Sequence, residues 1–304
     1  IAREGGFDSV SVPEHHATDD SYLLNDAVLG HLAEHVGDMG IASGMCLLPY
    51  HNPVRIAELG ATMDVLTGGQ FTLGVAQGYR DKEFEVFGVD RADAVGRFVE
   101  GVEIIERLWT EDSVTYDGEH FQLEDVSIRP QPVQDPRPPL WAGASNESSV
   151  RRAARKTDAF LGAHVPFDLA KRQVEDFRDE RAKQGLDEGE VGFIREAYVA
   201  ETTEKAIDTA APYILDKFDS LSEWGVIDDD GEDLSRRERF ERVSEGRYLI
   251  GTPDEVVADL ESLNETLGVD HLVARVQWPG MDHERAVDAI DLLGEEVIPR
   301  VADL

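Results

Sequence analysis

The sequence predicts a (β/α)8 TIM barrel, an α/β fold in which parallel strands alternate with helices. Short β-branched or apolar runs alternate with longer amphipathic stretches along the 304 residues, as repeated βα units require. Glycine and proline mark the helix ends, and polar or aromatic residues follow the candidate strands, where the active site of such a barrel lies. The regular alternation favours one barrel domain over residues 1–304 rather than two ordinary domains.

The candidate strands are short and rich in branched or aromatic side chains, as buried parallel strands are. Seven are expected, at Phe7–Val12, Ile41–Leu47, Phe71–Val75, Leu140–Ala142, Ala159–Leu161, Val191–Val199 and His271–Val276. Helical stretches are expected near residues 22–38, 54–66, 91–109, 146–157, 168–185, 203–217 and 253–303.

Helix signals support these assignments. Asn52-Pro53 opens the second helix, and Thr252-Pro253 places a capping residue and a proline at a later helix start. Residues 1–6 are typical of a last helical turn followed by its glycine stop. We therefore expect the numbered chain to lack the first βα unit of the barrel.

Two segments interrupt the alternation and are expected to be insertions. Residues 113–128 predict a hairpin that turns at Asp117-Gly118. Residues 218–246 are acidic and show no clear period, which is typical of a loop or a lid.

The charge balance is strongly acidic, with 63 acidic residues against 29 basic ones and a formal net charge of −34. Such a chain repels the phosphate backbone, so nucleic acid is excluded as a partner. Self-repulsion of this size needs screening by salt. We interpret it as a halophilic adaptation, the alternative being an ordinary acidic protein.

Cys46 is the only cysteine, which excludes a disulfide framework or a cysteine metal cluster within the chain. No apolar run reaches the length of a membrane span, and no signal-peptide pattern is recognisable. The expected location is therefore the cytoplasm, away from the membrane.

The residues after the first candidate strand, Glu14, His15 and His16, are the best candidates for catalysis. Histidine titrates near neutral pH, so it can carry a proton or donate to a developing anion. Adjacent residues of an extended segment point to opposite sides, so His15 and His16 are not expected to share a metal ion. The alternative is a structural histidine held by a carbonyl group.

Other segments could hold a ligand. A helix start such as the one after residue 143 offers free N–H groups and a favourable dipole to a phosphate, while small residues let a backbone approach a flat ring. Each segment also has an ordinary explanation as a core strand, a tight turn or a helix cap. The candidate residues are Gly44, Met45, Ala76, Gln77, Gly78, Ala144, Ser145 and Ser148.

Together these segments resemble the luciferase-like family of flavin-dependent monooxygenases over nearly the whole chain. The most specific stretch is residues 73–88, with the sequence LGVAQGYRDKEFEVFG. Glu14-His15-His16 resembles the family's Glu-His-His segment, and Gly251-Thr252-Pro253 resembles a motif near its end.

The resemblance implies that His15 lies beside a flavin, where it serves proton transfer or stabilises a peroxide. It places a cis peptide bond between Gly44 and Met45, against the flavin ring, and a phosphate site at Ser145 and Ser148. In one position the chain departs from the family pattern, because Gln77 stands where the family has a phosphate-binding arginine. A glutamine cannot supply charge, so Arg97 or Arg80 is expected to compensate.

The resemblance favours a two-component monooxygenase in which a partner reductase supplies reduced FMN, and O2 oxidises a small organic substrate. One alternative is a dehydrogenase or reductase that uses the deazaflavin F420, to which the substitution at Gln77 lends weight. Others are a flavin-binding protein without catalysis and a histidine-based metal hydrolase. Members of the family are often dimers, so a homodimer is expected. The substrate depends on loop side chains that vary freely among such proteins.

Overall fold

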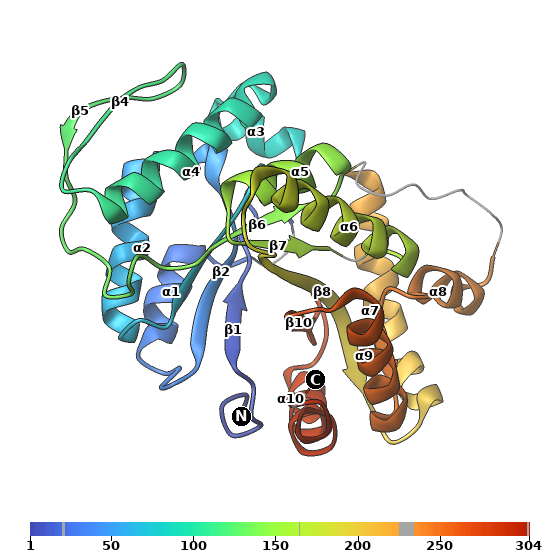
Figure 1. The fold of residues 1–304 in the computed structure, drawn as a ribbon. Coiled ribbons are helices and arrows are strands. Elements are labelled where there is room, and N and C mark those ends of the chain that lie inside the picture. Colours follow the sequence, from blue (N-terminus) through green and yellow to red (C-terminus); the bar gives the residue numbers. More distant parts are fainter. Residues whose placement is uncertain (20–21, 164, 225–233, 303) are drawn as a thin grey trace. The chain divides into compact units, whose positions relative to one another are not determined.

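The computed structural model describes residues 1–304 except residues 20–21, 164, 225–233 and 303 (Figure 1). Its contacts group into two compact units. The N-terminal unit comprises Asp8–Phe160 and Phe177–Gly189, and the C-terminal unit comprises Ile1–Phe7, Leu161–Asp176 and Glu190–Leu304. The prediction of a single domain stays a prediction.

Four parallel strands form the sheet of the N-terminal unit. They are β1 (Ser9–Val12), β2 (Gly40–Leu47), β3 (Phe71–Ala76) and β6 (Leu140–Ala144), paired in the order β1-β2-β3-β6. Strand β7 (Ala159–Gly162) carries the chain from this unit to the other. All five strands were predicted from the sequence, with ends that differ by one or two residues.

Helices pack along this sheet, with α1 and α2 beside the blue strands in Figure 1. In α2, the side chain of Asn52 accepts the Val54 N–H at 2.9 Å, and Gly68 ends the helix with a φ of 65°. The Trp109 indole N–H donates to the Ala57 carbonyl at 2.9 Å and ties α4 to α2. The helical elements are α1 (Asn25–Ala33), η1 (Leu48–Tyr50), α2 (Pro53–Thr67), α3 (Asp81–Phe87), η2 (Arg91–Asp93), α4 (Ala94–Thr110) and α5 (Glu147–Lys156).

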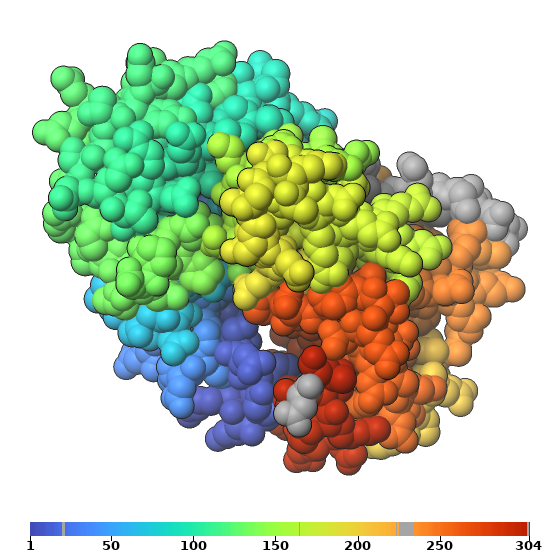
Figure 2. Space-filling model, viewed as in Figure 1, coloured from blue at the N-terminus to red at the C-terminus, as the bar shows by residue number. Residues whose placement is uncertain are grey.

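The predicted hairpin is confirmed as β4 (Val114–Asp117) paired antiparallel with β5 (Gln122–Val126). Its turn closes where the Gly118 N–H donates to the Phe121 carbonyl at 3.0 Å. The Glu100 carboxylate of α4 accepts the backbone N–H groups of three consecutive residues at the turn, Glu119, His120 and Phe121. Helix and hairpin are therefore joined, and their teal to green atoms form one continuous surface in Figure 2.

The sheet of the C-terminal unit is built on the long strand β8 (Glu190–Val199). Strand β10 (His271–Arg275) pairs with residues 192–196 of β8, and β9 (Leu249–Gly251) pairs with residues 197–199, both in parallel. Strands β8 and β10 confirm the sequence prediction. Strand β9 was missed because its three residues are too few to show a period.

Helices form the rest of the C-terminal unit, and α6 begins in it. No described helix combines the length and apolar character that a membrane crossing needs. A cluster of buried side chains joins α7 and α8 to β8, with Phe218, Phe240 and Trp278 among its members. The elements are α6 (Phe167–Gln184), α7 (Thr203–Glu223), α8 (Arg236–Ser244), α9 (Pro253–Leu267), α10 (His283–Leu292), the π-helical turn η3 (Leu293–Val297) and α11 (Ile298–Val301).

Two predictions about this unit were wrong in part. Residues 253–303 are not one helical stretch, because Gly268 in the left-handed conformation ends α9 before β10. In the expected acidic loop or lid at residues 218–246, the described residues are mostly helical, since α7 runs on to Glu223 and α8 covers Arg236–Ser244. Ser235 and Glu238 cap α8 reciprocally, a sequence signal that could have identified this helix. Residues 225–233 of that segment lie outside the described residues.

Candidate active site

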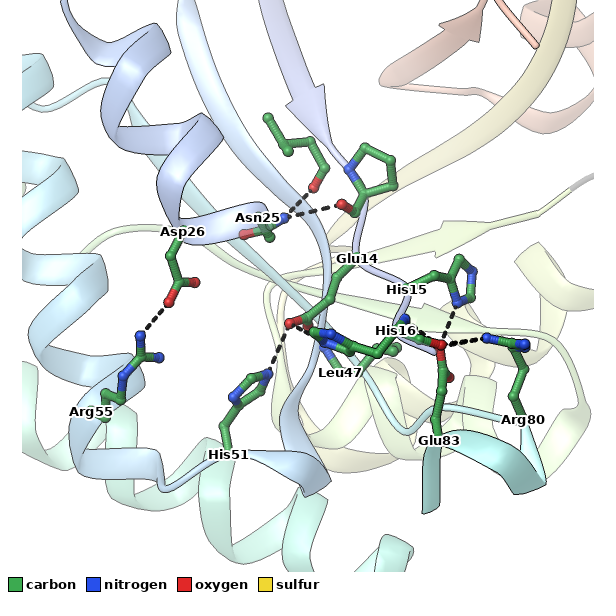
Figure 3. Close-up of polar contacts among 12 residues, drawn as sticks. Glu14, His15, His16, Asn25, Asp26, Leu47, His51, Arg55, Arg80 and Glu83 are labelled. Atoms are coloured by element: carbon green, nitrogen blue, oxygen red, sulfur yellow. Dashed lines mark hydrogen bonds and ion pairs between the residues drawn. The ribbon is translucent and has the colours of Figure 1, made fainter. Parts of the chain in front are cut away.

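The Glu14 carboxylate joins two histidines to strand β2 (Figure 3). Its Oε1 lies 2.9 Å from Nε2 of His16 and 2.9 Å from Nε2 of His51. Its Oε2 accepts the Leu47 N–H at 2.5 Å. Burial raises the pKa of Glu14, but the hydrogen bonds and the charge of His51, with the Leu47 N–H, outweigh this and lower the pKa to about 2. The group is therefore an ionised acceptor at neutral pH.

His15 reaches a second carboxylate, on helix α3 (Figure 3). Its Nδ1 lies 3.0 Å from Oε1 of Glu83, and its Nε2 lies 3.2 Å from the Tyr79 hydroxyl. The rings of Tyr22 and Tyr79 approach the imidazole edge-on, with centroids at 5.0 Å and 5.6 Å. His15 and His16 thus bind different carboxylates, as the extended segment predicted.

Glu83 is fully buried and serves as the acceptor for this side of the site. Its Oε1 also accepts the His16 N–H at 2.9 Å and an Arg80 N–H at 3.2 Å. Burial raises the pKa of Glu83, but the hydrogen bond and charge of His15, the His16 N–H and Arg80 together lower it. The ionised carboxylate of Glu83 can accept a hydrogen bond from Nδ1 of His15, and the tautomer that donates there leaves Nε2 as an acceptor.

The sequence interpretation did not single out Glu83, and it gave no individual role to Tyr79 and His51, which follow candidate strands. Two of them lie in the family-like stretch of residues 73–88, and His51 follows a candidate strand. Their partners are 68, 64 and 37 residues away along the chain, so spacing alone could not reveal the pairs.

Glu14, His16 and His51 also form a group whose potential ligand atoms all lie within 4.8 Å of one another. Carboxylate and imidazole groups of this kind can hold a divalent metal ion. Hydrogen bonds already account for their arrangement, and the expectation of no metal stays a prediction. His15 lies outside the group.

Gly44 and Met45 are joined by a cis peptide bond, which confirms the prediction for this position. The neighbouring strand β3 needs a glycine at this point, because a Cβ on Gly74 would lie 2.3 Å from the Ser43 carbonyl oxygen and 2.5 Å from the Met45 sulfur. Gly143 on β6 is less tight, since its Cβ would lie 3.1 Å from Met45 and 3.4 Å from the Cβ of Ala76. The structure thus brings Met45, Ala76 and Gly143 together.

The Gln77 side chain supplies a buried donor for a ligand, because its Nε2 has no partner within the described part of the chain. A buried amide without a partner is costly, and an acceptor on a bound molecule relieves the cost. The next residue, Gly78, has a φ of 75°, and a Cβ on it would lie 2.6 Å from the Tyr50 hydroxyl. These residues fit a flavin whose acceptor atoms reach Gln77.

The start of helix α5 is capped by its own side chains. The Asn146 carboxamide accepts the Ser149 N–H at 3.0 Å, and the Ser149 hydroxyl accepts the N–H groups of Asn146 and Ser145 at 3.1 and 3.2 Å. The Ser148 hydroxyl donates to Asn146 at 2.8 Å. Ala144 is partly buried, whereas Ser145 and Ser148 are exposed, so the predicted phosphate site at these residues stays a prediction.

The two arginines expected to compensate for Gln77 have partners of their own. Arg97 donates from Nε to the Pro49 carbonyl at 2.8 Å, and its guanidinium lies 4.8 Å from the centre of the Phe121 ring. Arg80 donates to the His16 carbonyl at 2.7 Å besides its contact with Glu83. Their compensating role stays a prediction.

Comparison with known proteins identifies the family. The family model of luciferase-like monooxygenases matches residues 1–271. The chain belongs to the luciferase-like monooxygenase family. The family predicted from the sequence is therefore confirmed, and with it the enzyme class, an oxidoreductase of the monooxygenase type.

Relatives of this luciferase-like chain include both flavin and F420 proteins. It is 27% identical to the oxygenase component of flavin-dependent trigonelline monooxygenase from Acinetobacter baylyi, over 100% of this chain and 88% of the relative. It is 29% identical to F420-dependent glucose-6-phosphate dehydrogenase from Microbacterium testaceum, over 99% of this chain and 91% of the relative. The chain also resembles the crystal structure of monooxygenase RslO1 from Streptomyces bottropensis, with a TM-score of 0.86 and 23% identity. The match covers 97% of this chain and 89% of that structure. That likeness confirms the α/β fold of TIM-barrel type.

Proposed function

We propose that this protein is the oxygenase component of a two-component monooxygenase that uses reduced FMN and O2 to oxidise a small organic substrate. The observation that carries the proposal is the Tyr79–His15–Glu83 chain of contacts at 3.2 and 3.0 Å. It lies in the same unit as the cis Gly44–Met45 bond and the Gln77 Nε2, which has no partner among the residues described. When bound, the reduced flavin supplies the electrons that activate O2.

In this proposal the residues of the chain position and move a proton. Glu83 keeps the His15 proton on Nδ1, so that Nε2 can take up or return a proton at the reacting atom. The Tyr79 hydroxyl donates to Nε2 and sets the direction of the ring. Glu14 and His16 complete the predicted catalytic segment, and Glu14 anchors it to β2 through the Leu47 N–H.

The cofactor residues of the proposal are those that the sequence indicated. Gly74 and Gly143 let the neighbouring strands pack closely against Met45, and the Gln77 amide offers the ring or its substituents a donor. A phosphate group would meet the start of α5 and its dipole. The set is Gly44, Met45, Ala76, Gln77, Gly78, Arg97, Ala144, Ser145 and Ser148.

Titration of the purified protein with FMN and with F420, read by absorbance and fluorescence, tests the cofactor. We expect FMN to bind and Gln77→Ala to weaken its binding, because the variant removes the buried donor. Preferential binding of F420 would instead support the dehydrogenase alternative, which the 29% identical F420-dependent relative favours.

Oxygen consumption with a flavin reductase and a panel of organic substrates tests the reaction. His15→Ala is expected to abolish substrate-dependent oxygen uptake while FMN still binds. Flavin binding with no turnover on any substrate would support a non-catalytic flavin-binding protein instead. Bound zinc in an active enzyme would point to the hydrolase alternative.

The proposal also includes a partner reductase, a homodimer and a salt-rich cytoplasm. The net charge of −34 supports the salt-rich setting. Val65 and Leu66 at the end of α2 are 41% and 59% exposed, which supports an interface near that helix. Sedimentation equilibrium at several KCl concentrations would test the dimer, and a monomer throughout would contradict it.

A further inference from the structure

The C-terminal unit holds an arginine that is buried with part of its charge unmatched. Arg195 on β8 is 1% exposed. Its Nη1 donates to the Ala163 carbonyl at 3.1 Å, while its Nη2 has no hydrogen-bond partner within the described residues. The guanidinium also lies 5.0 Å from the centre of the Phe193 ring.

A second arginine faces the same region. Burial together with the positive charge of Arg247 lowers the pKa of Arg195 to about 10. Arg247 donates to the Val243 carbonyl at 3.3 Å, but its buried Nε is also unpaired among the residues that the structure describes. Each of the two arginines thus has a buried N–H donor without a partner in the described part of the chain, and the charge of Arg247 acts on Arg195.

The charges of both arginines also act on the Tyr248 hydroxyl. Burial raises the pKa of Tyr248, as does the charge of Glu196, against the opposing effect of Arg247 and Arg195. The hydroxyl is therefore neutral at ordinary pH and keeps its proton as a donor. Each of the three side chains can donate to an acceptor.

The nearest carboxylate along the strand, Glu196, contacts other residues. Glu196 follows Arg195, and consecutive strand residues point to opposite faces of the sheet. Its oxygens accept from the Trp278 indole at 2.6 Å and from Arg275 at 3.2 Å, and the Lys217 amine lies 3.8 Å away. Within the described residues it forms no ion pair with Arg195.

Buried charges in proteins are normally paired, because removing a charge from water without a partner is very costly. Guanidinium groups bind carboxylates and phosphates through two N–H donors. We propose that Arg195 and Arg247, with the Tyr248 hydroxyl, form a binding site for an oxyanion: a carboxylate, sulfonate or phosphate group. This inference does not depend on flavin binding and goes beyond the proposed function.

Thermal melting of the full chain, without flavin and at fixed ionic strength in KCl, tests the site. The probes are potassium acetate, methanesulfonate, sulfate and phosphate. A ligand that binds the folded state raises the melting temperature with concentration, by a few degrees at about 100 times its dissociation constant for a chain of this size. We expect such a rise for the unaltered chain and its loss in Arg195→Met.

Arg181→Met is the matched control. Arg181 is also a buried arginine, but it pairs with Asp187 and donates to the Thr157 carbonyl at 2.8 Å. Its loss should lower the melting temperature and leave the response to anions intact. Arg195→Met should melt no lower than the unaltered chain in chloride alone, because the substitution removes an unmatched buried charge.

The anions distinguish two sources of the ligand. A response to acetate and methanesulfonate alone indicates an organic acid, and an equal response to sulfate and phosphate indicates a free inorganic oxyanion. A melting temperature of the unaltered chain that is the same in every oxyanion as in chloride overturns the proposal, as does an undiminished response in Arg195→Met. If that variant does not fold, Arg247→Met at the more exposed arginine serves instead, with a weakened response expected and an undiminished one again contradictory.

Discussion

At the scale of single residues, the proton position on His15 depends on a carboxylate that is fully buried. Replacing Glu83 by glutamine keeps the shape but removes the charge that holds the proton on Nδ1. We expect the turnover number to fall about 10- to 100-fold, as when a partner that orients a functional histidine is changed, while FMN binding is retained. The pH profile of the turnover number should shift as well.

Glu85 on the same helix is the matched control for this substitution. Its side chain is 71% exposed and contacts Lys82 at 3.0 Å. Glu85→Gln should leave turnover and its pH profile unchanged. Equal losses in the two variants would show that the effect comes from helix α3 and not from His15.

Glu14 gives the folded state a dependence on acid. Its pKa is about 2 in the folded chain against an ordinary value of 4.5. A carboxyl group whose pKa is lower in the folded than in the unfolded chain stabilises the folded state. This contribution is complete at pH values above the ordinary pKa and is lost as pH falls from about 4.5 toward 2. We expect the free energy of unfolding of the unaltered chain to approach that of Glu14→Gln over this range, as measured by urea denaturation at each pH.

That comparison cancels the contribution of the other carboxylates, whose protonation relieves self-repulsion as pH falls. A constant difference between the two proteins from pH 6 to the acid limit of the experiment would show that Glu14 is not ionised at neutral pH. The position of His51 and His16 around it would then need another explanation.

Some residues of the site could be predicted from the sequence and others could not. Glu14 and His15 follow a strand that the alternation marked, and strand ends carry the active site in such barrels. Gly44 and Met45 were placed by resemblance to a family. Glu83 could not be selected from its own sequence, because glutamates are frequent in helices and only the contact with His15, 68 residues away, distinguishes it.

At the scale of secondary-structure elements, glycine positions decide how closely β2 and β3 approach. A Cβ on Gly74 would lie 2.3 Å from the Ser43 carbonyl oxygen. Moving the backbone of β2 to relieve this clash would cost folding free energy. We expect Gly74→Ala to cost about 1–3 kcal/mol, the usual cost of an overpacked core. Chemical denaturation would measure it.

Gly30 provides the opposite case. It lies inside α1, where a Cβ would meet nothing within 4 Å. Gly30→Ala should stabilise the protein by about 0.5–1 kcal/mol, because alanine favours the helix. Destabilisation by both substitutions would mean that the contact between the strands is not the cause in Gly74→Ala.

Elements were predictable where their pattern was long enough. The longer strands and helices were found because each spans several periods of its hydrophobic repeat, and Asn52 and Thr252 marked helix starts. The short strands β6 and β7 were found as apolar runs between helical stretches. Strand β9 has three residues and α3 has seven, so their boundaries depend on tertiary contacts more than on local pattern. In α8, the acidic surroundings hid the buried pair Phe240 and Val243.

At the scale of the whole molecule, the charge of −34 should make stability depend on salt. Like charges spread over the surface repel one another, and added ions screen this repulsion. We expect the melting temperature to rise as KCl increases from about 0.1 M to molar concentrations, where the Debye length falls from about 10 Å to 3 Å. Stability independent of KCl would contradict the halophilic interpretation.

The fold class was predictable because it rests on alternation along the entire chain. The division of contacts into two units was not, since their boundary falls inside β7 and α6. Both segments look continuous in the sequence, and nothing in their composition changes at residue 160 or 176.

Cys46 follows the cis peptide bond and is 5% exposed, and burial raises the pKa of its thiol. Because it is the only thiol of the chain, a colourless disulfide reagent that releases a dye would report on this one position. The buried thiol can react only when β2 opens transiently, so its reaction rate would measure how often β2 opens. A ligand that contacts Met45 should lower the reaction rate of the Cys46 thiol. Candidate cofactors could then be ranked by this rate without knowledge of any substrate.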